Sequence, residues 1–477
     1  MKRATQIFLL MMPIFWMMSA CKVGKSYKGS DLEVPASLDD TDSLRTVNTD
    51  SLSTLLIDGP GWWSLFEDPL LDTLVAKALR HNLSLEISAQ NIEQARLALG
   101  MSKKDLLPKF GYGLQMVSGN ILGGMVGPEQ DFLFGGLQVS WEIDLWGKLR
   151  RRNEAARRQL LASEYGLRGM QLSLVSQVME TYFFLLQSRS QLEIAQRNAA
   201  LRDSMLMIIQ ARFDKGYAPG IDVDQAKIQR AIAAGAVPVY ERAVAQTSHA
   251  LSVLIGEWPG NIETSKALLE LRETQALPER MPIELLNRRP DLLQKEQAYA
   301  AQLAQTSAAK GDRLPTLSLN GSFGTGTNDF ADLNFSDPLW QASAGLVGPL
   351  FYWNQLKQRV QLEQSKSEQA RLDYQLQQLQ AVREVKDYSV ALKTLATQEQ
   401  ILKERVAAAL HAQKLSQERY NQGVTSYLEY LESQRQAFEA ELSLMQVAAE
   451  RLSTYAQLYK ALGGGWLDAS EQAPTNN

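Results

Sequence analysis

The sequence predicts a mostly helical α+β chain whose two similar halves each contribute two strands and several helices. Three observations predict this fold class. Hydrophobic periodicity changes from two to about 3.6 within one stretch, residues 132–158. The segments 148–214 and 354–421 contain no proline and are rich in helix-forming residues. Residues of the first half also recur in the second half at one constant distance.

The clearest strand is the segment 137–145, where apolar and polar side chains alternate. One face carries Leu137, Val139, Trp141, Ile143 and Leu145. The same alternation occurs in 110–115, 317–323 and 340–346. Strands with one apolar and one polar face are typical of a soluble sheet with one solvent-exposed face. They are equally typical of a membrane barrel with lipid outside and water inside.

The recurring residues define the order of the elements. Asp105, Leu107 and Pro108 recur as Asp312, Leu314 and Pro315, and Gly216 recurs as Gly423, an offset of 207 (423 − 216). Each half is expected to contain a first helix (70–104 and 283–310), a Gly-rich loop between its strands (118–131 and 324–337), a long helix (148–214 and 354–421) and a shorter helix (222–255 and 427–462). A weak point is expected in the first helix at His81 and Asn82.

Element lengths constrain how the chain assembles. A helix of about 66 residues is roughly 100 Å long, so two shorter helices should stack end to end beside it. Four strands cannot enclose a lumen, and an open sheet would leave unpaired edges in hydrocarbon. A membrane-spanning chain must therefore oligomerise, and three copies would supply a twelve-stranded barrel continued by a helical barrel.

The first residues have the features of an export signal. Lys2 and Arg3 precede an apolar segment, residues 7–18, that is too short to cross a bilayer. Cys21 is the only cysteine and follows Ser19 and Ala20, as in a bacterial lipobox, so we expect it to carry the lipid. The adjacent Trp62 and Trp63 are expected to anchor the following segment to the body of the protein.

These observations divide the chain into six regions. They are a signal peptide (1–20), a lipidated tether (21–60), repeat 1 (61–256), an equatorial linker (257–282), repeat 2 (283–465) and a C-terminal tail (466–477).

Composition argues against several classes of function. A net charge of −4 gives no basic surface for nucleic acid. The three histidines, His81, His249 and His411, belong to different predicted helices and have no Cys or carboxylate at ligand spacing. We therefore expect no catalytic residue, no metal site and no cofactor.

Several motifs together resemble the outer-membrane efflux protein family of TolC-like channels, in its lipoprotein branch. They are Cys21, Trp62-Trp63 with the following Phe66-x-Asp68-Pro69-x-Leu71, the segment 141–147, Arg289-Pro290-Asp291-Leu292, Pro349-Leu350-Phe351 and the turns at Gly216 and Gly423. The resemblance implies a homotrimer in the outer membrane that extends into the periplasm and partners a periplasmic adaptor and an inner-membrane RND-type transporter. Tyr352-Trp353-Asn354 departs from the Gly-rich turn that is commoner there.

The turns at Gly216 and Gly423 are predicted to cap the two long helices. The resemblance implies that they also form the periplasmic tip, where acids surround a closed aperture. The corresponding gate residues are Asp222, Tyr420, Glu429 and Glu432. Six carboxylates in a trimer would attract cations and share protons. Thr425 stands where some relatives carry a basic latch residue.

A second group of candidate residues lies at the start of the first long helix, and comprises Lys148, Arg150, Arg151 and Arg152. Cations are unfavourable at a helix N-terminus, so we expect a compensating anion. Phospholipid head groups are one candidate, with Trp141 and Trp146 in an aromatic girdle; a solvated charged surface is the other.

The sequence therefore favours a passive exit duct for small molecules. Two alternatives remain open at this point. One is a protein-secretion duct of the same fold, and the other is a lipid-anchored periplasmic coiled-coil adaptor. Apolar side chains on one face of every strand argue against the adaptor.

Overall fold

A computed structural model describes residues 27, 62–122, 125–271, 288–327 and 338–464. The signal peptide, Cys21, most of the tether, part of the linker and the C-terminal tail lie outside the described residues. The chain divides into two compact units. One comprises residues 1–32, 90–164 and 294–376, and the other comprises residues 33–89, 165–293 and 377–477.

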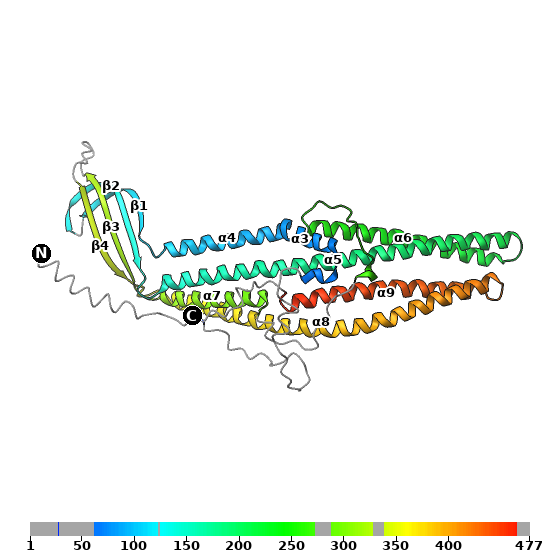
Figure 1. The fold of residues 1–477 in the computed structure, drawn as a ribbon. Helices are drawn as coiled ribbons and strands as arrows, with labels where there is room; N and C mark the ends of the chain where they lie inside the picture. Colours follow the sequence, from blue (N-terminus) through cyan, green and yellow to red (C-terminus); the bar gives the residue numbers. More distant parts are fainter. Residues whose placement is uncertain (1–26, 28–61, 123–124, 272–287, 328–337, 465–477) are drawn as a thin grey trace, which may run out of the picture. The chain divides into compact units, whose positions relative to one another are not determined.

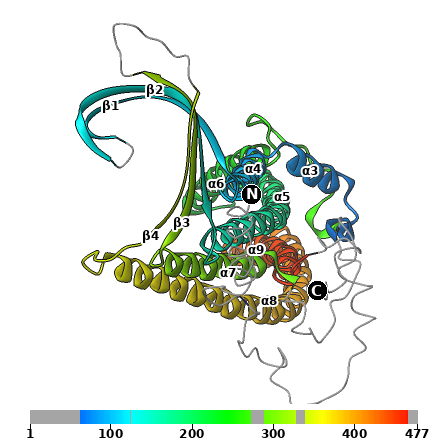
Figure 2. The same cartoon turned by 90° about the vertical axis from the view of Figure 1, so that its left-hand side faces the viewer.

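The first unit contains one antiparallel sheet in which each strand pairs with the next along the chain. Figures 1 and 2 show it as a curved sheet with its strands in the order β1-β2-β3-β4. The strands are β1 (Lys109–Leu122), β2 (Met125–Ile143), β3 (Thr316–Thr327) and β4 (Pro338–Val347).

The first hairpin corrects the loop expected at 118–131, because both strands extend through it. Ser118 pairs with Asp131, and the register shifts between Gly119 and Ile121. Among the described residues, the pairing of β2 with β3 begins at Leu133, so Pro128 has no described partner on that side. Proline is tolerated where a strand has a partner on one side alone. The second expected loop is also shorter, since β3 continues to Thr327.

The strand register places the alternating apolar side chains of neighbouring strands beside one another on one face. Consecutive partners across the sheet form an apolar row of Tyr112, Leu137, Phe323 and Trp340. The next row, on the opposite face, is Gly111, Gln138, Ser322 and Gln341. Because side chains alternate along a strand, this register confirms the two-faced strands predicted from the sequence.

The helices repeat in length between the two halves. α4 (Leu83–Lys104) and α7 (Pro290–Gly311) have 22 residues each. α5 (Lys148–Asp214) and α8 (Gln355–Asn421) have 67 each. α6 (Gly220–Leu254) and α9 (Tyr427–Ala461) have 35 each. The predicted long helices are therefore confirmed almost to the residue. None of the helices among the described residues combines the length and apolarity that crossing a membrane requires.

Side-chain bonds connect helices within each unit. In the first unit, Arg158 of α5 bonds Gln297 of α7 at 2.9 Å, and Gln302 of α7 bonds Glu363 of α8 at 2.6 Å. In the second unit, Arg451 of α9 pairs with Glu399 of α8 at 2.5 Å. These contacts join helices that are far apart in the sequence.

The predicted weak point in the first helix is a true break. α3 (Pro69–His81) ends there, and the side chain of Asn82 accepts the backbone N–H of Ser84 at 2.9 Å, starting α4. The Asn82 amide also donates to the carbonyl of Leu254 at 2.9 Å. The end of α6 therefore meets the start of α4, which confirms that the shorter helices stack end to end at this point.

Two short 3-10 helices, η1 (Trp62–Phe66) and η2 (Leu268–Glu270), belong to the core of the second unit. Trp62 stacks on Tyr459 with ring centroids 4.6 Å apart, which confirms the expected anchoring. Asp68 follows η1 and is almost fully buried. Its carboxylate caps α3 and accepts the hydroxyls of Tyr182 and Ser265. Burial beside this carboxylate raises the pKa of Tyr182.

Candidate functional sites

The two glycine turns end the long helices with the same geometry. Gly216 has φ 78° and Gly423 has φ 75°. The amide after each glycine donates five residues back, Tyr217 to the carbonyl of Arg212 at 2.8 Å and Val424 to that of Arg419 at 3.0 Å. This is the Schellman arrangement, in which glycine accepts the left-handed conformation without steric cost. The predicted role of the glycines as helix caps is confirmed.

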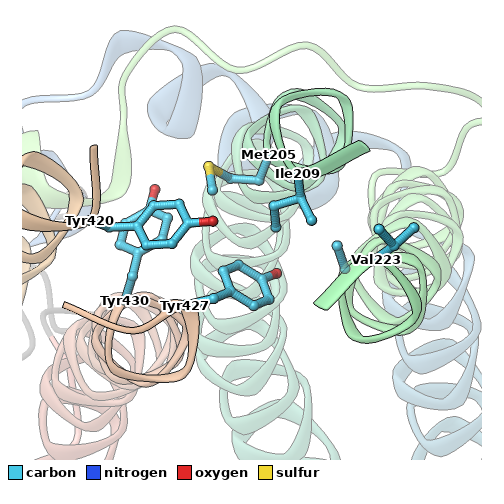
Figure 3. Close-up of a cluster of buried hydrophobic side chains, with 7 residues drawn as sticks. Met205, Ile209, Val223, Tyr420, Tyr427 and Tyr430 are labelled. Atoms are coloured by element: carbon cyan, nitrogen blue, oxygen red, sulfur yellow. The ribbon is translucent and has the colours of Figure 1, made fainter. Parts of the chain in front are cut away.

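Beside these turns, α5, α6, α8 and α9 share a buried cluster, hereafter the tip cluster. Its members are Met205, Ile209, Val223, Ala226, Tyr420, Tyr427 and Tyr430. Figure 3 shows the three tyrosines facing the side chains of Met205 and Ile209. Tyr420 stacks on Tyr430 and tilts toward Tyr427, with centroids 5.9 Å apart in both pairs. Side chains from both halves therefore meet at one point.

Two arginines of α5 contact the tyrosines, and the sequence analysis did not identify them. The guanidinium of Arg212 lies over the ring of Tyr420, 4.6 Å from its centroid. Arg202 is buried and donates to Gln434, whose amide donates to the Tyr430 hydroxyl at 2.6 Å. Burial lowers the pKa of Arg202, and burial raises that of Tyr420 against the opposing effect of Arg212. A cation over an aromatic ring is attractive, and more so when desolvated.

The predicted gate residues separate into two groups. Asp222 lies in the first turn of α6, near enough that its charge raises the pKa values of Tyr420 and Tyr427. The structure thus brings Asp222 and Tyr420 together. Glu429 and Glu432 are exposed on α9 and lie outside the tip cluster.

The exposed acids of α9 have partners of their own. Glu429 accepts the hydroxyl of Thr425, the residue at the latch position. Glu432 pairs with Arg435 at 2.6 Å, and Arg435 also pairs with Glu439 at 2.6 Å. Hydrogen bonds from Arg435 and Gln436 lower the pKa of Glu432 to about 2. Arg435, three positions later and one helical turn on, is the signal that sequence reasoning missed. Proton sharing among the carboxylates of neighbouring copies stays a prediction.

The basic residues at the start of α5 also have partners within the chain. Lys148 pairs with Glu142 at 2.5 Å, Arg150 with Asp144 at 3.1 Å, Arg151 with Glu154 at 2.6 Å and Arg152 with Asp312 at 2.8 Å. The expected compensating anions are therefore present within the chain itself, and binding of lipid head groups to these cations stays a prediction. Each of the four basic side chains at the β2–α5 junction therefore has a carboxylate partner within the protomer.

Asp144 is the residue that organises this junction. Its carboxylate accepts the backbone N–H groups of Leu149 and Arg150 at 3.0 and 2.9 Å, which caps α5. The two predicted girdle tryptophans also bond backbone carbonyls of the chain: the indole of Trp141 donates to the carbonyl of Leu106 and that of Trp146 to the carbonyl of Pro315, at 2.9 and 2.6 Å. Trp146 is half-buried.

Within the described ranges, no three His, Cys, Asp or Glu side chains are arranged to hold a metal ion.

The two halves together contribute a curved sheet with one apolar face, very long helices, and a turn region rich in tyrosine and charge. This combination defines a class of protein, the channels that join outer-membrane strands to long helices.

The comparisons with known proteins identify the family. The family model of the outer membrane efflux protein matches residues 74–257 and 281–464. The pyoverdine export outer membrane protein OpmQ of Pseudomonas putida is 30% identical over 414 residues, covering 85% of this chain and 88% of that protein. The toluene efflux pump outer membrane protein TtgF of Pseudomonas putida is 29% identical over 421 residues, covering 87% of each.

The solved structure of the Campylobacter jejuni CmeC outer membrane channel has the same fold, with a TM-score of 0.83, 23% identity, and coverage of 94% of this chain and 96% of that one. The chain belongs to the outer membrane efflux protein family. It is an outer-membrane channel that serves as an efflux exit duct.

Proposed function

We propose that the chain works as a homotrimer, whose twelve strands form a barrel in the outer membrane and whose helices form a periplasmic tunnel. The sheet is the observation that supports this most directly. It has one apolar face and, among the described residues, its outer strands β1 and β4 each have one strand partner. Unpaired strand edges are untenable in hydrocarbon, and neighbouring copies would complete both.

We infer a tripartite assembly in which transport through this chain is passive. A periplasmic adaptor and an inner-membrane RND-type transporter would dock at the tip and supply energy and substrate. OpmQ and TtgF carry the names of pyoverdine and toluene export, which supports small molecules as the substrate class. The equal helix lengths and the two family-model matches support an internal repeat and the division into repeats 61–256 and 283–465.

We also propose that Cys21 carries the lipid and that the mature chain begins there, with the signal peptide removed. The lipobox sequence supports this proposal. Mass spectrometry of the purified protein should find a diacylglyceryl group on Cys21. An unmodified Cys21 would contradict the lipoprotein assignment, whereas the barrel would still hold a non-lipidated variant in the membrane.

The gate is proposed to lie at the tip, with Tyr420 inside the tip cluster, Asp222 beside it, and Glu429 and Glu432 around the aperture. Carboxylates around a narrow axis attract cations. Single-channel recording in planar bilayers should show small, cation-selective currents that trivalent cations block. Glu429→Gln combined with Glu432→Gln should abolish that block. Unchanged selectivity and block would mean that these acids only start a helix.

One measurement tests the assembly itself. Native mass spectrometry in detergent should find trimers, and planar bilayers should show conductance from the same sample. Folded monomers without conductance would contradict the barrel and favour the lipid-anchored adaptor alternative. A secretion duct for proteins would be favoured if exported polypeptides, and no small molecules, required the chain.

A further inference from the structure

Large apolar side chains stand exposed where β4 leads into α8. Leu350 is 100% exposed, Trp353 is 83% exposed and Phe351 is 69% exposed. The rings of Phe351 and Trp353 pack edge to face with centroids 4.7 Å apart. We call Leu350, Phe351, Tyr352 and Trp353 the junction segment. An exposed apolar group of this size marks an interaction surface more often than a random feature of a soluble face.

The backbone of the junction segment is strained. Trp353 has φ 47° and is followed by Asn354 with φ 64°. A bulky side chain in the left-handed region is a steric outlier that persists only where other interactions compensate. The N–H of Gln355 donates to the carbonyl of Tyr352 at 2.8 Å, so the turn tightens directly into α8. In this conformation the Trp353 ring packs on Phe351 and stays exposed.

Positive charge follows the aromatic residues. Lys357 and Arg359 are exposed in the first turns of α8. Within the part of the chain that the structure describes, neither makes an ion pair, although the charge of Arg359 helps to lower the pKa of Glu363; the corresponding cations of α5, Arg150 and Arg152, both pair with carboxylates. Cations at a helix N-terminus are unfavourable without a nearby anion. An anionic partner from outside the protomer therefore fits this position.

We propose that the junction segment is the protomer's anchor in the inner, phospholipid leaflet of the outer membrane. Its aromatic and leucine side chains insert at the boundary of the acyl chains, and Lys357 and Arg359 bind lipid phosphates. This rests on the proposed barrel, because the segment directly follows β4, where Trp340 and Leu346 of the apolar face are 77% and 64% exposed. Tryptophan belts and basic side chains that reach head groups recur at such boundaries.

Fluorescence quenching tests the position of Trp353. The full-length protein is inserted into vesicles of phosphatidylethanolamine and phosphatidylglycerol that contain phosphatidylcholine brominated at acyl carbons 6 and 7. Trp353→Phe should lower the fraction of the tryptophan emission that the brominated lipid quenches. The matched control, Trp146→Phe, should remove unquenched emission, because Trp146 is half-buried and bonds the Pro315 carbonyl. Adding Leu350→Trp to Trp353→Phe should restore quenching.

A second comparison tests the cations. Brominated phosphatidylglycerol should quench Trp353 more strongly than brominated phosphatidylcholine, and Lys357→Gln with Arg359→Gln should remove the difference. If Trp353→Phe and Trp146→Phe lose the same quenching and Leu350→Trp restores none, while the channel still conducts, the anchor is wrong and the barrel stands. A Trp353→Phe variant that loses trimers by native mass spectrometry would assign the segment to a neighbouring copy. Absence of conductance in the wild type would instead contradict the barrel.

Discussion

The two strand-to-helix junctions start helices of the same length by different chemistry. At the β2–α5 junction Asp144 caps the helix, Gly147 adopts φ 75°, and every cation of the first turns has a carboxylate partner. At the β4–α8 junction Asn354 takes the left-handed position with φ 64°, and Trp353 before it is also left-handed.

Gly147 and Asn354 occupy the same position of the repeat, since each immediately precedes a 67-residue helix. The backbone requirement is therefore common to both halves, whereas the side chains are not. Asparagine is the non-glycine residue that most readily accepts this conformation. The difference teaches that the two halves share the point at which the backbone turns into the long helix, while the side chains around each turn differ.

The first test asks whether the halves are equivalent in the sheet, although they differ at the junctions. Leu137 and Phe323 are strand partners on the apolar face. Leu137→Arg or Phe323→Arg should each cost about 2–4 kcal/mol if the positions are near the middle of the bilayer, because arginine would face lipid. Guanidinium unfolding in detergent-lipid micelles measures the loss.

The controls for this test are the next residues on the opposite face, Gln138→Arg and Ser322→Arg, which should be tolerated better. Trp141→Arg and Leu319→Arg, nearer the strand ends, should fall toward the lower limit of the range, and Ser140→Arg and Ser318→Arg are their controls. Equal damage on both faces would mean that the faces are misassigned.

The second test removes the cap of the first junction. Asp144→Ala takes away the acceptor of two backbone N–H groups and the partner of Arg150, so it should lower the free energy of unfolding by about 2 kcal/mol. Gln355→Ala, at the start of α8, should change it by less than about 0.5 kcal/mol. Equal effects would mean that Asp144 adds nothing specific to α5. The same unfolding titration compares the two variants.

The third test changes the residue at the shared left-handed position in each half. Gly147→Ala should destabilise by about 1–2 kcal/mol, from backbone strain alone, because an added Cβ would meet its nearest neighbour, the Arg150 side chain, at an ordinary 3.5 Å. Asn354→Gly should be neutral or stabilise by up to about 0.5 kcal/mol, because it removes strain. Melting temperatures in micelles give the signs. Destabilisation by both variants would show that Asn354 contributes a contact beyond its conformation.

The sequence was sufficient to predict most of the fold. Helix bounds at Lys148, Asp214 and Asn421 followed from periodicity, missing proline and the glycine turns. The first hairpin was predicted too short because Gly119, Gly127 and Pro128 are ordinary turn signals. The pairing of β1 with β2 on both sides of Gly127 and Pro128 is what places these residues in a strand.

Fewer of the contacts made by the site residues could be predicted from the sequence. Helical spacing could have identified Arg435 as a partner of Glu432, since the residues are three apart. Arg212 over Tyr420 could not be identified in that way, because the two residues belong to different halves and meet only through the packing of α5 against α8. The carboxylate of Asp312 reaches Arg152 across 160 positions for the same reason.

The last and smallest effect concerns charge at the tip, where the second half carries an acid–base pair and the first half has Gln225 at the matching position. Arg435 holds the pKa of Glu432 down to about 2, so the stabilisation from this pair is present above the ordinary value of 4.5 and is lost as pH falls toward 2. Cation selectivity of the wild-type channel should therefore show no step from Glu432 between about pH 3 and 7. Arg435→Gln should create a step near the ordinary glutamate pKa, measured as reversal potential against pH in planar bilayers. Arg230→Gln, which removes an exposed guanidinium paired with Asp203 in the first half, should create none. The same step in both variants would mean that selectivity follows total charge and not the state of Glu432.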